Sequence, residues 1–170
     1  MLIIIKYISL ISIIFICSFL GIYKSKKFEN RVSELKEMQS SLNMFKSKIE
    51  FTYEPIGEIF KEISNVIYKD KENIFKITTE EMKQKNASQS WYLAIEKCKN
   101  DLNIEDKETI KFMGKLLGKT DKIGQINEIN LTSNLLEKQI EKAEEEKIKN
   151  TKLYKTLGIV FGLGITIILI

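Results

Sequence analysis

Apolar residues form long runs at both ends of the chain. Leu2 to Ile22 consists mostly of Ile, Leu, Phe and Ser and carries a single charge. A helix of this length crosses a bilayer core of roughly 30 Å. Leu157 to Ile170 is apolar apart from one threonine, and as a helix it reaches about 21 Å, which is short for a span. This pattern predicts an N-terminal transmembrane anchor over residues 1–23 and a shorter transmembrane segment over residues 156–170.

The first apolar run has two interpretations, a retained anchor and a cleaved signal peptide. Cleavage needs small residues at alternating positions just after the apolar run, and no such pattern precedes Lys24. A lipoprotein signal would place small residues before its cysteine, whereas Phe15 and Ile16 precede Cys17. A retained anchor is therefore the favoured interpretation.

Residues 24–155 show apolar positions at helical spacing, which predicts an all-α, membrane-anchored domain of about six helices. No stretch alternates apolar and polar residues between turn dipeptides, so we expect no sheet. Pro55, the only proline, marks a break, because the residue before a proline disfavours helix. The first expected helix runs from Phe28 to this break, the second starts at Pro55, and the third spans about Asn73 to Gln84. The fourth runs from a cap at Ser88 or Ser90 to Cys98, and the fifth from a cap at Asn103 to Gly118. The sixth begins at a cap at Thr120 or Asp121 and continues through residues 120–155.

The apolar stripes of these helices predict the core. The first domain helix has heptad-like spacing, so it either packs on its own domain, which we favour, or offers a seam to a partner. In the last helix, Leu131 and Leu135 lie beside the stripe and are expected to widen it. The predicted core residues are Phe28, Leu35, Met38, Leu42, Phe45, Ile49, Ile56, Ile59, Phe60, Ile63, Ile74, Phe75, Met82, Trp91, Ala94, Ile95, Cys98, Ile110, Met113, Leu117, Ile126, Ile129, Leu136, Ile140 and Ala143.

The stretch from Phe112 to Gln125 contains three glycines and joins the last two predicted helices. Its Gly118-Lys119-Thr120 triplet looks like the end of a phosphate-binding loop. Such a loop has another glycine five residues before this one, where the chain has Met113, and it follows a strand rather than a helix. We therefore interpret the stretch as a corner, in which Gly118 ends the fifth helix in a left-handed conformation.

The composition argues against an active site. The 170 residues contain no histidine, so the commonest general base and zinc ligand is missing. Cys98 has no evident activating base, and Asp and Glu occur with Lys at helical intervals, as ion pairs on exposed faces do. We predict a protein that is not an enzyme and that uses no cofactor and no metal. An enzyme that uses paired carboxylates is the weaker alternative.

Basic residues gather beside both apolar runs, on the side of the central domain. The positive-inside bias then places the domain in the cytoplasm. The net charge of +4 is small and is explained by these flanks, so we expect no nucleic-acid partner. The flanking residues are Lys24, Lys26, Lys27 and Arg31 after the first run, and Lys147, Lys149, Lys152 and Lys155 before the second.

Two pairs of glycines have a spacing that allows close helix contact. Gly158 and Gly162 form a Gly-x-x-x-Gly step in the second apolar run, with Gly164 close by. Small residues at this spacing let membrane helices approach closely, but glycine is also common in membrane helices, and both interpretations stay open. Gly114 and Gly118 lie one turn apart on the predicted fifth helix, where another helix has room to come close.

Several short motifs, spread along the chain, match one known family. They are Phe112-x-Gly114, Leu117-Gly118, Asp121 and Gln125; the later run Lys152-Leu153-Tyr154 with Leu157-Gly158 and Gly162-Leu163; Glu50 before Pro55; and Ser90-Trp91 before Ala94. With these motifs the chain resembles the stage III sporulation protein AB family of endospore-forming bacteria. The resemblance covers nearly the whole length, including the order of anchor, helical domain, charged helix and short terminal anchor.

The resemblance implies a domain similar to the cytoplasmic helical domains of the platform protein of type II secretion and type IV pilus systems. It also implies an assembly that links mother cell and forespore, in the mother-cell membrane facing the forespore. The expected partners are a secretion-type ATPase, stage III sporulation protein AA, other membrane proteins of the same operon, and membrane lipid. The candidate interaction or structural residues are Gly114, Gly118, Asp121 and Gln125, and the candidate membrane-helix packing residues are Gly158 and Gly162.

The leading hypothesis is a non-enzymatic membrane scaffold that couples the ATPase to membrane subunits. The rival hypothesis is a membrane-anchored sensor or signalling adaptor, which would use the same anchor and domain. An operon shared with a secretion-type ATPase, expressed during sporulation, would favour the scaffold over the sensor.

Overall fold

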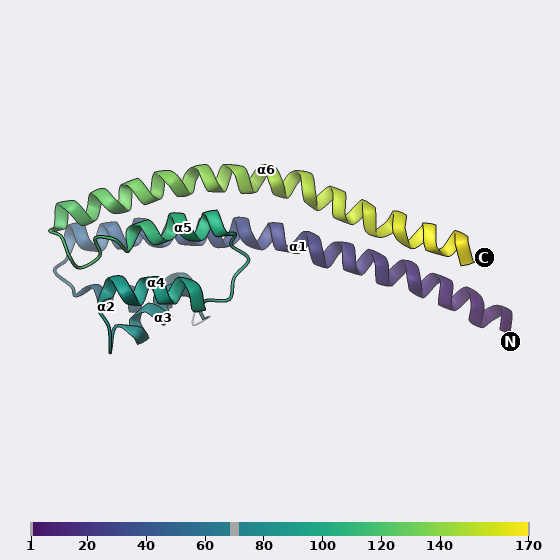
Figure 1. Cartoon of the computed structure of the whole chain (residues 1–170), viewed down its shortest axis with the longest axis horizontal. Helices are drawn as coiled ribbons and strands as arrows, with labels where there is room; N and C mark the ends of the chain where they lie inside the picture. Colours follow the sequence, from purple (N-terminus) through teal and green to yellow (C-terminus); the bar gives the residue numbers. More distant parts are fainter. Residues whose placement is uncertain (1, 69–71, 170) are drawn as a thin grey trace. The chain divides into compact units, whose positions relative to one another are not determined.

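The computed structural model describes residues 2–68 and 72–169, and every regular element in them is an α-helix (Figure 1). The predicted all-α fold is confirmed. The predicted anchor and first domain helix are one continuous helix, α1, because no proline interrupts it. The helices of the described residues are α1 (Leu2–Phe51), α2 (Ile56–Tyr68), α3 (Ile74–Glu81), α4 (Ala87–Lys97), α5 (Ile104–Met113) and α6 (Lys122–Leu169).

The chain divides into two compact units. The helical unit comprises Ser33–Glu141 and contains α2 to α5 with parts of α1 and α6. The apolar unit comprises residues 1–32 and 142–170. These bounds follow from helix packing. The anchor boundaries at residues 23 and 156 follow from hydropathy and stay predictions.

Four aromatic rings from four helices meet in the core of the helical unit. The ring of Phe60 on α2 lies 4.9 Å from that of Phe45 on α1, 5.3 Å from Phe75 on α3 and 5.5 Å from Trp91 on α4, between centroids. All four side chains are fully buried. Such ring pairs contribute about 0.5–1.5 kcal/mol each beyond their buried area. The cluster therefore holds the short helices α2, α3 and α4 against this part of α1.

The predicted core is largely confirmed, but the buried stripe of α6 is narrower than expected. Leu131 is 46% exposed, whereas Thr132 is fully buried. The hydroxyl of Thr132 donates to the carbonyl of Glu128 at 2.9 Å, so it is buried with its hydrogen bond made. The expectation that Leu131 widens the stripe was wrong, because the packed face passes through Thr132 instead. Of the predicted core residues, Phe28, Ile49, Ile56, Met82 and Ile126 are half-buried and the others are buried.

Asparagine side chains begin three of the helices. Each accepts a hydrogen bond from the backbone N–H three residues later, at 3.0 Å for Asn73, 2.9 Å for Asn86 and 2.8 Å for Asn103. Asp106 returns the bond to the N–H of Asn103 at 3.0 Å, which completes a capping box. The predicted cap at Asn103 is confirmed, and Asn73, expected only as the approximate start of the third helix, is the cap of α3.

Two other predicted boundaries differ from the structure. The cap of the fourth helix is Asn86, so placing it at Ser88 or Ser90 was wrong; both serines lie inside α4 and are buried. The third helix ends at Glu81 rather than near Gln84. Past Glu81 the backbone bonds tighten to a three-residue spacing, as is common where a helix ends.

Candidate functional site

The corner between α5 and α6 begins earlier than predicted. α5 ends at Met113, and Gly114, with φ −68°, caps it. Gly118 has the expected left-handed backbone, with φ 71°, but it lies in the turn that follows. The prediction that Gly118 ends the fifth helix was therefore wrong, although its conformation was right.

Hydrogen bonds from α4 explain the early end of α5. Trp91 Nε1 donates to the carbonyl of Ile110 at 3.0 Å, and Ser88 Oγ donates to the carbonyl of Gly114 at 2.6 Å. In a continuing helix the carbonyl of Ile110 would accept from the N–H of Gly114. That N–H instead donates to the carbonyl of Lys111 at 2.9 Å. Side chains of α4 thus terminate α5, a cause that no local pattern in α5 reveals.

Gly114 is a point of close approach, as expected, but the neighbour is a side chain. A Cβ placed on Gly114 would lie 2.6 Å from Cδ1 of Trp91. At Gly118 the nearest atoms to such a Cβ are Ala87 Cβ at 3.7 Å and Ile56 Cδ1 at 3.8 Å. Gly114 is therefore required for space, and Gly118 for its backbone conformation.

Asp121 and Gln125 stabilise the start of α6. Asp121 Oδ1 accepts from the N–H of Gly124 at 2.9 Å, which makes Asp121 the cap of the helix. Gln125 Nε2 donates to the carbonyl of Thr120 at 3.2 Å. Both candidate residues thus hold the corner itself. Replacing either residue would therefore disturb the turn, whether or not the residue also contacts a partner.

Exposed apolar side chains lie beside this corner. Phe51 is 79% exposed, Tyr53 fully exposed and Ile123 68% exposed. Lys122 Nζ lies 5.8 Å from the centre of the Tyr53 ring and donates to the carbonyl of Glu50, so the end of α1 adjoins the start of α6. We call Phe51, Tyr53, Lys122 and Ile123 the tip surface. No sequence motif singles out these residues; the available signal is that Ile123 lies off the apolar stripe of α6.

In the apolar unit, the glycines of α6 pack against α1. A Cβ on Gly158 would lie 2.7 Å from the carbonyl oxygen of Cys17, and one on Gly162 would lie 3.0 Å from the Cα of Ile14. Gly21 completes the contact, since its Cα is 3.2 Å from a Cβ placed on Gly158. The membrane helix that Gly158 and Gly162 contact is therefore the first apolar run of the same chain. A Cβ placed on Gly164 would meet no atom within 4 Å in the described part of the chain, apart from the backbone of its own helix turn.

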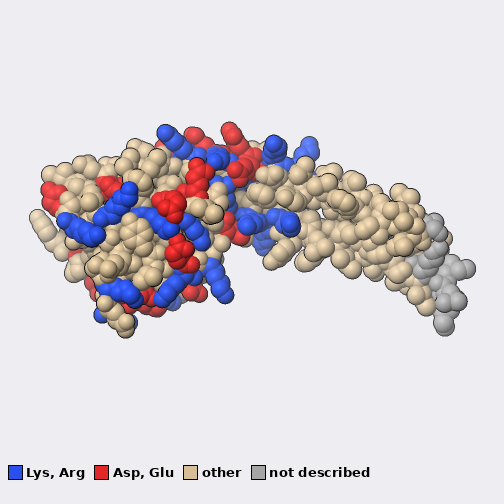
Figure 2. Space-filling model, viewed as in Figure 1, with Lys and Arg blue, Asp and Glu red and all other residues tan. Residues whose placement is uncertain are grey.

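Polar and aromatic contacts continue this helix pair beyond the glycines. Phe28 stacks on Tyr154, with ring centres 5.8 Å apart. Arg31, which is 5% exposed, contacts Glu146 at 2.6 Å. Burial makes the loss of either partner of such a pair costly. Figure 2 shows charged side chains at one end of the apolar unit. The rest of the coloured surface of this unit is almost free of charge.

Burial raises the pKa values of a thiol and a carboxyl group in the helical unit. Burial raises the pKa of the Cys98 thiol, which disfavours the nucleophilic thiolate. Burial also raises the pKa of Glu34 to about 7, although a hydrogen bond from the N–H of Asp101 at 2.8 Å lowers it. Within residues 2–68 and 72–169, no group of three or more His, Cys, Asp or Glu side chains is placed to hold a metal ion.

These features define a class of protein. The chain is all-α, with a compact helical unit, and two of its helices, α1 and α6, are long and apolar enough to cross a membrane by length and composition. The glycine contact pairs those two helices. Such features are those of an all-α protein with two helices suited to association with a membrane.

The chain belongs to the stage III sporulation protein AB family, whose model matches residues 6–170. Stage III sporulation protein AB of Bacillus subtilis (strain 168) is 22% identical over 168 residues, which cover 96% of this chain and 98% of that protein. A solved structure of stage III sporulation protein AB (SpoIIIAB) superposes with a TM-score of 0.64 at 20% identity, covering 69% of this chain and 96% of that one. The predicted family is confirmed, and the solved structure shows the same fold.

Proposed function

We propose that this chain is a non-enzymatic scaffold in the mother-cell membrane that faces the forespore. In this proposal the helical unit lies in the cytoplasm and binds a secretion-type ATPase, stage III sporulation protein AA. The apolar helices bind other membrane proteins of the same operon. The scaffold then couples nucleotide-driven changes in the ATPase to the membrane subunits.

The observation that carries this proposal is the extent of α6. It is one helix from Lys122 to Leu169, and it contributes core residues such as Leu136 to the helical unit and the Gly158 contact to the apolar unit. Gln125 to Thr156 contains neither proline nor glycine, so no residue with a strong tendency to break a helix lies between the two. A force applied to one end of such a helix can reach the other.

The orientation of the proposed scaffold rests on its lysines. Lys24, Lys26 and Lys27 follow the first apolar run, and Lys152 and Lys155 precede the second. Cytoplasmic flanks of membrane helices are enriched in basic residues. This bias supports a cytoplasmic helical unit. This orientation can be tested with a cysteine at an exposed position such as Lys83, in a chain whose native cysteines are replaced. The new cysteine should not react with membrane-impermeant thiol reagents in intact cells. Reaction would show that the helical unit faces the outside.

The tip surface is the best candidate for the ATPase contact. Exposed aromatic and aliphatic side chains, flanked by a cation, are typical of the centre of a protein interface. Tyr53 and Ile123 project from the surface at the corner where α6 begins. A partner bound there would act directly on the start of the helix that carries the second apolar run.

Co-purification of the full-length chain with the ATPase tests the scaffold. The pair should bind in at least one of three states: nucleotide-free, with ADP, or with a non-hydrolysable ATP analogue. Tyr53→Ser with Ile123→Ser should weaken binding, because both remove exposed apolar contact area. The matched control is Val66→Ser with Ile104→Ser, which removes comparable exposed side chains elsewhere on the helical unit. Absence of binding in all three states would contradict the proposal.

A helix break tests the coupling separately from binding. Glu144→Gly with Glu145→Pro should abolish sporulation and leave membrane insertion and ATPase binding intact, because proline interrupts the hydrogen bonds of α6. Glu144→Ala with Glu145→Ala removes the same carboxylates and keeps the helix, so it should sporulate. Normal sporulation of the glycine–proline variant would show that α6 does not act as a lever.

A further inference from the structure

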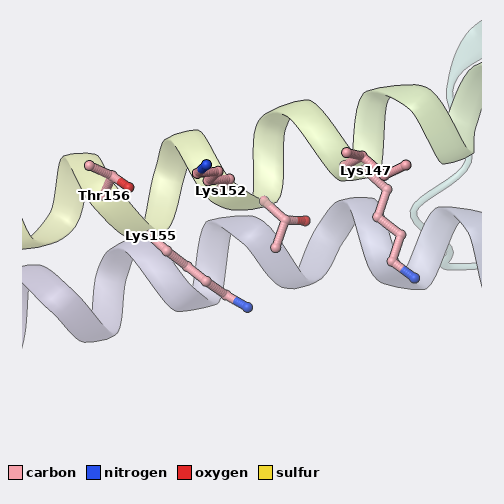
Figure 3. Close-up of a pocket in the computed structure, with 6 residues that line it drawn as sticks. Lys147, Lys152, Lys155 and Thr156 are labelled. Atoms are coloured by element: carbon pink, nitrogen blue, oxygen red, sulfur yellow. The ribbon is translucent and has the colours of Figure 1, made fainter.

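Three lysines and two threonines line a shallow groove on α6. The groove has a volume of about 410 Å³ and is lined by Lys147, Ile148, Thr151, Lys152, Lys155 and Thr156 (Figure 3). In Figure 3, Lys147 and Lys155 extend to the same side of the helix, with Lys152 between them along the chain. The groove thus places three ammonium groups along one stretch of α6.

The charge is positive on the membrane side of the groove, whereas Glu144, Glu145 and Glu146 immediately precede it on α6. No Asp or Glu occurs in residues 1–28 or 147–170 of the chain. Lys24 on α1 lies near this part of α6, with its Nζ 6.0 Å from the centre of the Tyr154 ring. The carboxylate of Glu29 is 3.9 Å from Lys155 Nζ, and both side chains are nearly half exposed, so this pair neutralises the groove only weakly. An anion is the complementary ligand.

One donor in the groove is unsatisfied within the described protein. The Oγ1 of Thr151 is buried and has no hydrogen-bond partner among residues 2–68 and 72–169. Threonine hydroxyls on helices usually donate to a carbonyl one turn earlier, as Thr132 does here. A buried polar group without a partner costs free energy that an acceptor from outside the chain would recover.

The position of the groove along α6 selects the source of the anion. Lys155 lies two residues before the apolar run that begins at Leu157. From Lys152 to Lys155 the helix rises about 4.5 Å, which fits within the roughly 5–8 Å that the headgroups add on each side of the hydrocarbon core. Ile148, at 76% exposure, and the lysine stems add apolar surface, which suits contact with lipid better than contact with a free ion.

We propose that this groove binds the phosphodiester headgroup of an anionic phospholipid in the leaflet that faces the helical unit. Lys147, Lys152 and Lys155 supply the charge, and rotation of the Thr151 side chain toward the groove lets its hydroxyl donate a hydrogen bond to a phosphate oxygen. The proposal rests on the membrane location given above. It adds a lipid specificity that the scaffold function does not require.

Lipid retention by the full-length chain tests the site. The chain is reconstituted in bilayers of phosphatidylcholine with a minor fraction of phosphatidylglycerol, tested for resistance to carbonate extraction, then extracted with a mild detergent. Retained lipids are measured by mass spectrometry. The wild type should retain phosphatidylglycerol in preference. Lys147→Gln with Lys152→Gln and Lys155→Gln should reduce that enrichment by about fivefold or more, because juxtamembrane lysines each attract anionic lipid.

Two further variants separate the groove from general charge. Lys76→Gln with Lys83→Gln and Lys99→Gln makes the same change in net charge on the helical unit and should keep the enrichment. Thr151→Val keeps the shape and the charge, and it should reduce the enrichment without changing insertion. Equal retention by the groove variant and the wild type, or equal loss in the control, would overturn the proposal.

Three other outcomes are also decisive. Displacement of phosphatidylglycerol by inorganic phosphate would show a site for a free anion and overturn the lipid assignment. Release of the chain by carbonate would contradict the membrane location itself, and with it the scaffold. An inserted chain with no lipid preference would contradict the lipid site and leave the scaffold standing.

Discussion

The backbone of Gly114 lies against the indole of Trp91 so closely that a Cβ on the glycine would stand 2.6 Å from Cδ1 of the ring. The same indole donates to the carbonyl of Ile110, and it belongs to the aromatic cluster with Phe60 and Phe75. Trp91 therefore joins the core of the helical unit to the corner that precedes α6. A change at either residue is felt at the other.

Gly114→Ala should destabilise the helical unit by about 1–3 kcal/mol, the usual cost of overpacking a core. The indole cannot move aside without losing its hydrogen bond to Ile110 and its ring contacts. Urea unfolding in detergent, followed by fluorescence of the single tryptophan, measures the change. Gly57→Ala is the matched control: the nearest atom to its Cβ is Met82 Cε at 3.7 Å, and alanine favours helix, so it should be neutral or slightly stabilising. Equal effects of the two substitutions would contradict the role of close packing.

Gly118→Ala should destabilise by about 1–2 kcal/mol for a different reason. The backbone at Gly118 has φ 71°, where an L side chain collides with its own carbonyl, while the space around it is ordinary. Gly118→Asn should cost less, because asparagine tolerates the left-handed region. The same urea titration compares the two. A larger loss for asparagine than for alanine would show that space, not conformation, limits this position.

Gly162→Cys should form a disulfide with Cys17 inside one chain. A Cβ on Gly162 would lie 3.3 Å from the Cβ of Cys17, close to the separation of bonded cysteines. Mild oxidation of the membrane-inserted chain, with Cys98 replaced by alanine, should block labelling of both thiols without forming a dimer. Gly164→Cys, whose surroundings are open, should stay reduced or link two chains. If Gly162→Cys gave dimers alone, the two apolar runs would pair between chains instead.

Glu34 should make the stability of the helical unit depend on pH near neutrality. Burial, opposed by the bond from the Asp101 N–H, raises the folded-state pKa from 4.5 to about 7. The folded state therefore holds a proton that the unfolded state releases, so stability is full below about pH 4.5 and falls as the pH rises through 7. The chain contains no histidine, so few other groups titrate in this window.

Urea midpoints measured across this range should fall with rising pH for the wild type. Glu34→Gln, which stays uncharged, should show a nearly constant midpoint and exceed the wild type in stability above pH 7. Glu80→Gln, an exposed carboxylate on α3 that is not among the groups acting on Glu34, is the control and should keep the wild-type slope. A slope that survives Glu34→Gln would place its origin at another group.

Periodicity and capping along the chain determined which segments are helical and which faces are buried. Asn103 acts within three residues, so its role as a cap followed from spacing; the same signal left Thr120 and Asp121 open at the start of α6 and missed Asn86 at the start of α4. The two long apolar helices and the left-handed backbone of Gly118 were also predictable, because each depends on residues that are close together in the sequence. The family, too, followed from short motifs in the sequence, and the match over residues 6–170 confirms it.

Only the tertiary structure decided how separate segments meet. The end of α5 depends on Ser88 and Trp91 of another helix, and the neighbours of Gly158 are Cys17 and Gly21, far away along the chain. The tip surface was likewise invisible, because the exposure of Tyr53 and Ile123 depends on what packs beside them. Sequence patterns record intervals along one segment. Hydrogen bonds and close contacts between segments depend on distances in space, which those intervals do not contain.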